Sequence, residues 1–242
     1  MIKEALQYIV GLKEPVIQEI HDDVYSDKEL HRVDKYIPTA EPIKMNTLSS
    51  LVDYIKNRID TMPESMIIHV VSPEEVKLFS CLNDNREREY LVDVKAQVPA
   101  FRYETFIDRE AFTISAQAKF IDDPATDKAI LLQFAGTVEC GTITEYGDDG
   151  VSQKAVVRDG IASKKDDIVP NPVKLRPYRT FVEVEQPLSE FIFRMKQDKY
   201  DGIHCAIFEA DGGAWKNAAM KNIKKYLEYE LADFINQFTV IS

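Results

Sequence analysis

The chain has 242 residues, and 45% of them are hydrophobic, which is enough to bury a sizeable core in one large domain or two small ones. Its formal net charge of −11 makes the surface as a whole repel nucleic-acid phosphates and anionic membranes, so a nucleic-acid role would need a local basic patch. We expect a single domain over residues 1–242, with a helical and arm-like N-terminal region (1–62), a strand-rich core (63–210) and a C-terminal helix (211–242).

The N-terminal region begins without the continuous apolar run and cleavage site of a signal peptide. No later stretch approaches the ~20 uninterrupted apolar residues of a membrane span. These absences predict a soluble intracellular protein with no membrane partner. Apolar residues recur over residues 2–20, and Gly11 and Pro15 interrupt them, which predicts two short helices.

A polar segment follows from His21 to Pro42, and its prolines favour an extended path. It is either a plain connection or an arm that binds a partner or a neighbouring subunit. Its apolar side chains show no clear period, so we expect them to gain order by packing on a neighbour or on the sheet. We therefore predict a homo-oligomer.

The next stretch predicts a helix, with Asn46 or Thr47 as its N-cap and its end before Met62-Pro63. Its apolar stripe is typical of a face that packs on a core, and consists of Leu48, Leu51, Val52, Ile55 and Ile59.

From Met66 the apolar period changes to two, which predicts short strands. The clearest alternation runs from Phe112 to Phe120, and residues 163–168 resemble an exposed loop tip. Further strands are expected at Met66–Val71, Val76–Phe79, Tyr90–Val94, Thr137–Ile143 and Phe191–Met195, with a hairpin at Asp148–Val157. Hairpin-length connections favour an α+β fold, with a mostly antiparallel sheet of roughly seven to nine strands from Met66 to Phe208 and helices at the N- and C-terminal ends.

The segment Asn171–Phe181 is the first candidate site, because it gathers two arginines and a lysine in an acidic chain. Arg176 and Arg179 flank Tyr178, and guanidinium groups beside an aromatic ring are how phosphates and bases are commonly held. The alternative is an edge strand whose arginines pair with Glu183 or Glu185.

The second candidate site is the turn before the last helix, where the apolar strand Ile203–Phe208 stops and Gly212 and Gly213 redirect the backbone. We expect Gly212 or Gly213 to adopt a positive φ there. The helix start beyond it has unpaired N–H groups, so a phosphate or carboxylate could bind there with help from Lys216. In the alternative interpretation Asp211 caps the helix and Trp215, the only tryptophan, fills the core.

Three cysteines, Cys81, Cys140 and Cys205, lie far apart in apolar runs and are expected to be reduced core residues. The spacings of common metal motifs are missing, so we predict neither a metal nor a cofactor. Four histidines are scattered along the chain, namely His21, His31, His69 and His204. The two that lie in apolar strands, His69 and His204, are expected to be partly buried and satisfied.

Three stretches together resemble the YfdQ-like proteins of phages and prophages. They are the Leu30–Tyr36 entry (LHRVDKY), the Thr47–Asp60 helix and Phe106–Phe112 (FIDREAF) within the strand-rich middle. The DGGAW stretch at Asp211–Trp215 looks like a variant found in phages of Gram-positive hosts. The family has no established activity to carry over. The resemblance implies a viral origin and the cytoplasm of a bacterial host.

Two main hypotheses follow for the function. The first is a non-enzymatic binding protein, a homo-oligomer that acts during infection on a host or phage protein or on a small ligand. The second is a nucleotide- or single-stranded-nucleic-acid-binding protein, such as a sponge for host defence signals, in which Tyr178 or Trp215 stacks a base. An enzyme is a third possibility, and its acid and base candidates would be His204, Glu209 and Asp211.

Overall fold

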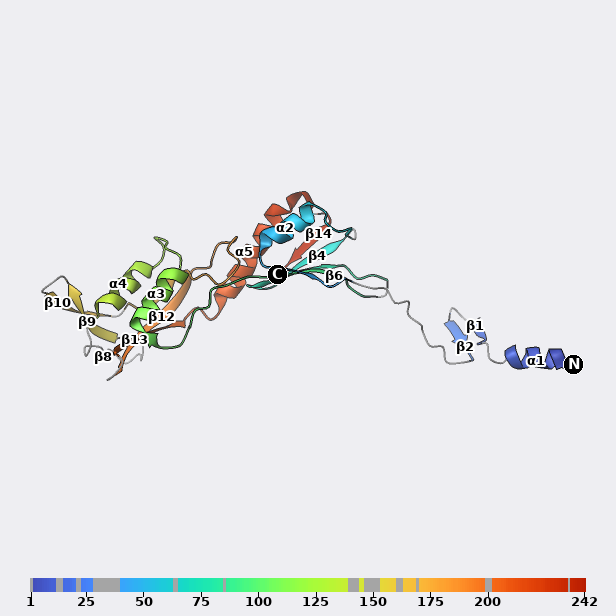
Figure 1. Ribbon diagram of the computed structural model, residues 1–242, viewed down its shortest axis with the longest axis horizontal. Helices are drawn as coiled ribbons and strands as arrows, with labels where there is room; N and C mark the ends of the chain where they lie inside the picture. The colour runs from blue at the N-terminus through green and yellow to red at the C-terminus, as the bar shows by residue number, and fades with distance from the viewer. Residues whose placement is uncertain are drawn as a thin grey trace. The chain divides into compact units, whose positions relative to one another are not determined.

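The computed structural model describes residues 2–11, 15–20, 23–27, 40–62, 65–84, 86–138, 144–145, 153–159, 163–168, 170–198, 202–234 and 236–242. The chain divides into two compact units, Met1–Thr39 and Ala40–Ser242. The boundary between them falls inside the predicted N-terminal region (1–62). Figure 1 labels the α-helices and most strands of both units.

The first unit contains helix α1 (Ile2–Gly11) and an antiparallel hairpin of β1 (Ile17–Ile20) and β2 (Asp23–Ser26). The prediction of two short helices is right for the first and wrong for the second. Ile17 and Ile20 have helical spacing, but β-branched residues follow Pro15 directly, and they favour the extended chain. Most of the predicted arm, His21–Pro42, lies outside the described residues.

The second unit contains a five-stranded sheet in the order β14-β4-β5-β6-β3. Its centre is antiparallel, whereas the two edge strands β14 and β3 run parallel to their neighbours. The strands are β3 (Ile43–Met45), β4 (Met66–Ser72), β5 (Glu75–Ser80), β6 (Tyr90–Lys95) and β14 (Phe238–Ile241). Helices α2 (Leu48–Lys56) and α5 (Ala214–Glu230) lie on one face of this sheet, and the short 3-10 helix η1 (Ala232–Phe234) leads into β14 (Figure 1).

Helix α2 begins where the sequence predicts. The Ser50 N–H donates to the Thr47 hydroxyl over 3.2 Å, which caps the helix start. The four predicted stripe residues within the helix are buried in the core: Leu48, Leu51, Val52 and Ile55. Ile59 is exposed, because the helix already ends at Lys56.

The same unit contains an antiparallel four-stranded sheet, β11-β12-β13-β7, and an antiparallel three-stranded sheet, β10-β9-β8. Helices α3 (Arg109–Lys119) and α4 (Lys128–Thr137) share a second core with the four-stranded sheet. The strands are β7 (Ile107–Asp108), β8 (Thr144–Glu145), β9 (Gln153–Asp159), β10 (Ser163–Ile168), β11 (Val173–Leu175), β12 (Ser189–Asp198) and β13 (Gly202–Glu209).

The α+β class with mostly antiparallel sheets is confirmed, although the strands form separate sheets and α3 and α4 are internal helices. The strand predicted over Phe112–Phe120 is wrong. Phe112 and Ala116 are buried at helical spacing, while Ile114, also in the alternating set, is 62% exposed. The missed signal is Asp108, whose carboxylate accepts the N–H groups of Glu110 and Ala111 and caps α3.

Smaller differences follow the same pattern. Residues 163–168, predicted as a loop tip, form β10, which pairs along its whole length with β9. The hairpin turn Asp148–Gly150 lies outside the described residues, although β8 and β9 pair on either side of it. Cys205 is buried as expected, whereas Cys81 is exposed, and Cys140 lies outside the described residues.

Candidate functional site

A cleft of about 340 Å³ lies where the second unit brings together five segments of the chain. Glu74 comes from the β4–β5 turn, Glu209 from the end of β13, and Trp215 and Lys216 from the first turn of α5. The remaining lining residues are Val98, Pro99, Ala100, Phe101, Tyr103, Tyr178 and Arg179.

Arg179 is held in the cleft wall by a folded loop whose centre is the buried Gln186. The side-chain oxygen of Gln186 accepts the N–H groups of Arg179 and Thr180 at 3.0 and 3.2 Å. Its side-chain nitrogen donates to the Phe181 carbonyl at 2.8 Å. A buried amide with all its hydrogen bonds made fixes a single loop conformation. The backbone therefore holds Arg179 in a defined position at the wall of the cleft.

The Arg179 side chain is only 5% exposed and is surrounded by partners. It forms an ion pair with Glu209 at 2.7 Å, and it donates to the Ser189 hydroxyl. Its guanidinium lies 4.0 Å from the centre of the Trp215 ring and 5.3 Å from that of Phe191. Burial lowers the pKa of Arg179, but a guanidinium remains protonated in proteins. The site thus contains a fixed cation in contact with two aromatic rings.

The turn before α5 satisfies its own backbone groups. Gly212 and Gly213 adopt positive φ values of 62° and 80°, as predicted, and Trp215 is buried. The Asp211 carboxylate accepts the Gly213 N–H at 3.0 Å, and the Asp211 carbonyl accepts the Ala214 N–H at 3.1 Å. Gly213, and not Asp211, occupies the N-cap position. The two amides that an anion would use are already paired, which supports the structural interpretation of this turn.

Aromatic rings form the rest of the wall. Phe101 and Tyr103 lie with their ring centres 4.9 Å apart, and Tyr103 stacks on Phe191 at 5.9 Å. Burial raises the pKa of Tyr103 to about 12, so its phenol is neutral at physiological pH and can donate a hydrogen bond.

The cleft unites four of the seven site residues predicted from the sequence, namely Tyr178, Arg179, Trp215 and Lys216. Gly212 and Gly213 shape the turn but are not among the lining residues. Arg176 lies elsewhere, in ion pairs with Asp123 at 3.3 Å and Glu185 at 3.0 Å, and the second of these is a pair that the alternative interpretation predicted.

Sequence reasoning missed Glu74, Tyr103 and the stretch 98–101 as cleft residues. No local pattern marks them, because the chain between β6 and β7 reaches the site only through tertiary packing. One anchor is the Glu104 N–H, which donates to the Ile207 carbonyl of β13 at 2.8 Å.

The acid and base candidates do not form a catalytic group. His204 and Glu209 both belong to β13, but their odd spacing places them on opposite faces of the strand. Glu209 is engaged by Arg179, and Asp211 by the turn amide. Among the described residues, no three His, Cys, Asp or Glu side chains are grouped to hold a metal ion.

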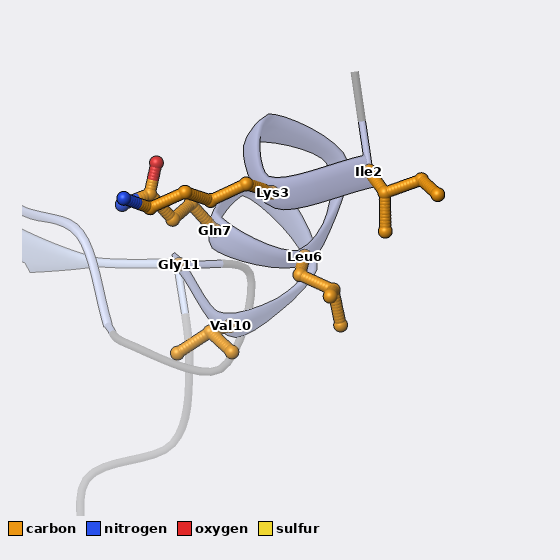
Figure 2. Close-up of a pocket in the computed structure, with 6 residues that line it drawn as sticks. All are labelled: Ile2, Lys3, Leu6, Gln7, Val10 and Gly11. Carbon is orange, nitrogen blue, oxygen red and sulfur yellow. The ribbon is translucent and has the colours of Figure 1, made fainter.

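Helix α1 in the first unit presents a different kind of surface. An open depression of about 610 Å³ runs along it, and Figure 2 shows Ile2, Leu6 and Val10 pointing away from Lys3 and Gln7. The helix buries none of its residues. One helix supplies the whole lining, so the depression cannot enclose a small ligand as the cleft does.

No protein-family model matches the chain, and neither does any curated protein or solved structure. In the part of the chain that the structure describes, no helix is long and apolar enough to cross a membrane.

Proposed function

We propose that the chain is a non-enzymatic binding protein that holds a small ligand in the cleft beside Arg179 and Trp215. The observation that carries the proposal is the buried Arg179 guanidinium, fixed by Glu209 and stacked on the only tryptophan at the wall of that cleft. The cleft volume of about 340 Å³ is near the lower end of the range for small-molecule pockets. Pre-organised walls favour binding, because little side-chain entropy remains to be lost.

The absence of catalytic chemistry from the lining favours binding over catalysis. The described residues that line the cleft include no serine, cysteine or histidine. Of its two carboxylates, Glu209 already pairs with Arg179. A hydrolytic or transfer reaction would need a nucleophile beside a base, or an acid and base in reach of one substrate.

The aromatic rings support the nucleotide-binding alternative, whereas the ion pairs of the arginines count against it. Tyr178 and Trp215 line the same cleft, as base stacking requires. Both Arg176 and Arg179 are paired with carboxylates, so neither is free to hold a phosphate. From the resemblance to YfdQ-like proteins we propose that either function acts in an infected bacterial cell, with a host or phage protein as a further candidate partner.

We also propose that the protein is a homo-oligomer, and that α1 contributes to the contact between copies. Ile2 is 80% exposed on this helix, and Leu6 and Val10 are more than half exposed on the same side. A helix of this length is marginal alone in water, and so is a two-stranded hairpin. A second copy offers the same apolar face, and pairing the two would bury both.

A ligand screen by thermal shift tests the binding proposal. A ligand at a hundred times its Kd should stabilise the fold by about 2.7 kcal/mol, which corresponds to a Tm rise of roughly 5–10 °C for a unit of this size. The screen should include nucleotides, nucleosides, amino acids and sugars. The Ala100→Trp variant should lose the shift, because the exposed Ala100 lines the cleft and a large side chain there fills it.

Ala125→Trp is the matched control, since Ala125 is equally classed as exposed and is not a lining residue. A flat screen, or a ligand that shifts both variants like the wild type, would show that the cleft is not the binding site.

Light scattering tests the oligomer. Leu6→Lys should dissociate it, whereas Tyr8→Lys, at an exposed residue of α1 that does not line the depression, should not. A wild-type chain that is monomeric at micromolar concentration would refute this part of the proposal.

A further inference from the structure

The charges that line the cleft cancel. Arg179 and Lys216 supply two positive charges, and Glu74 and Glu209 supply two negative ones. The ion pair at 2.7 Å consumes one of each. The cleft belongs to a protein whose formal net charge is −11. A ligand with several negative charges would therefore meet no compensating field.

The uncharged part of the lining favours flat rings. Phe101, Tyr103, Tyr178 and Trp215 all line the same volume. Aromatic side chains stack on a nucleobase or a similar ring through its π-face, largely independently of its substituents. The Arg179 guanidinium on the Trp215 ring extends this flat surface with a plane of its own.

Two buried donors in the wall have no acceptor. Arg179 Nε and Trp215 Nε1 are both inaccessible to solvent, and within the described part of the chain neither has a hydrogen-bond partner. Arg179 is 4% exposed and Trp215 9%. A buried N–H without an acceptor is costly, and a carbonyl or ring nitrogen supplied by a ligand would relieve that cost after a small side-chain movement.

From these three observations we infer that the ligand is a planar heteroaromatic molecule of the nucleobase class, recognised by its ring and its in-plane acceptors and not by a phosphate. This inference rests on the proposed function of the cleft and specifies its ligand. A nucleoside satisfies it fully. A nucleotide binds only through its base, with the phosphates outside the neutral cleft.

Isothermal titration calorimetry of the full chain with four probes tests the inference: adenosine, ATP, ribose 5-phosphate and inorganic tripolyphosphate. Adenosine should bind, ATP should bind no more tightly than adenosine, and the two probes without an aromatic base should not bind. Tighter binding of ATP, or any binding of these two base-free phosphates in the cleft, overturns the inference.

The outcome separates this inference from the proposed function. If adenosine fails and the broader screen finds a non-aromatic ligand that Ala100→Trp blocks, the inference is overturned and the binding function stands. If nothing in either set binds, both are overturned.

A pair of tyrosine variants provides a second test. Tyr178→Leu should weaken adenosine binding by roughly five- to a hundredfold, the loss expected for one base–aromatic stack. Tyr229→Leu is the control, because Tyr229 is 79% exposed on α5 and does not line the cleft. Equal adenosine affinity in the two variants would overturn the inference, provided that both melt as the wild type does.

Discussion

The Arg179–Glu209 pair should be one of the strongest local contributions to the stability of the second unit. Arg179→Met keeps an apolar stem against Trp215 while removing the guanidinium. The loss comprises a charge-assisted bond to Glu209, a hydrogen bond to Ser189 and the stacking on Trp215. Burying the charged guanidinium costs free energy, which is also why the pKa of Arg179 is lowered. Removing the charge abolishes this cost and offsets part of the lost stability. The net expectation is a destabilisation of about 2–4 kcal/mol.

A double-mutant cycle isolates the pair from these other terms. Glu209→Gln keeps a hydrogen-bond acceptor and removes the charge, so it alone should cost about 1 kcal/mol. Because Glu209 is 30% exposed, solvent screens the pair in part, and we expect a coupling free energy of about 1.5 kcal/mol.

Urea denaturation followed by tryptophan fluorescence is the suitable assay. Trp215 is the only tryptophan, so its emission reports the unfolding of the wall in which the pair lies. Urea leaves ion pairs unscreened, unlike guanidinium chloride. A coupling below about 0.5 kcal/mol, with unchanged m-values, would refute the argument that Arg179 is fixed by Glu209.

Two further predictions concern local backbone structure. Gly213→Ala should destabilise the fold by about 1 kcal/mol, because the φ of Gly213 is 80° and an L-residue is strained there. Gly136→Ala, within α4, should instead stabilise the fold by about 0.5 kcal/mol. Both sites have open space for a Cβ, so stability changes of the same sign at the two sites would contradict the argument. Hydrogen bonds from backbone N–H groups, that of Ala111 first, lower the pKa of Asp108 below 3.8 in the folded protein. The ionised Asp108 carboxylate therefore stabilises the fold fully above its unfolded-state pKa, and this stabilisation is lost as pH falls through its folded-state pKa. The stability difference between wild type and Asp108→Asn should therefore be constant near neutral pH and shrink below about pH 4; a difference that does not change on acidification would count against this cap.

The sequence predicted elements well where one signal decided them. Thr47 and the stripe behind it predicted α2, and the two glycines predicted a left-handed turn before α5. It failed over α3, where alternating apolar residues and a capping Asp108 gave opposite answers. In an alternating segment every second apolar residue also has the four-residue spacing of one helix face, as Phe112, Ala116 and Phe120 do. The capping residue Asp108 was therefore the better predictor of a helix here.

The candidate site was predictable only on one side. Tyr178, Arg179, Trp215 and Lys216 stood out because charged and aromatic residues are adjacent in the sequence. The opposite side, from Glu74 and residues 98–103, comes from the chain around the five-stranded sheet, and only the packed fold brings it to the cleft. The same packing pairs Arg179 with Glu209, whereas the sequence had offered Glu183 or Glu185 as its partner.

The two interpretations of Trp215 raised by the sequence, a core residue and a stacking surface, are compatible in the structure. Trp215 is only 9% exposed, and yet it lines the cleft and its ring lies against the Arg179 guanidinium. Stability and the proposed ligand binding therefore depend on the same two side chains, and a variant at either one should lose both together. Tyr178 is half-buried and Ala100 is exposed, so changes there alter the cleft with less effect on the core. A loss of ligand binding at these two positions with an unchanged Tm is the result that would assign the function to the cleft itself.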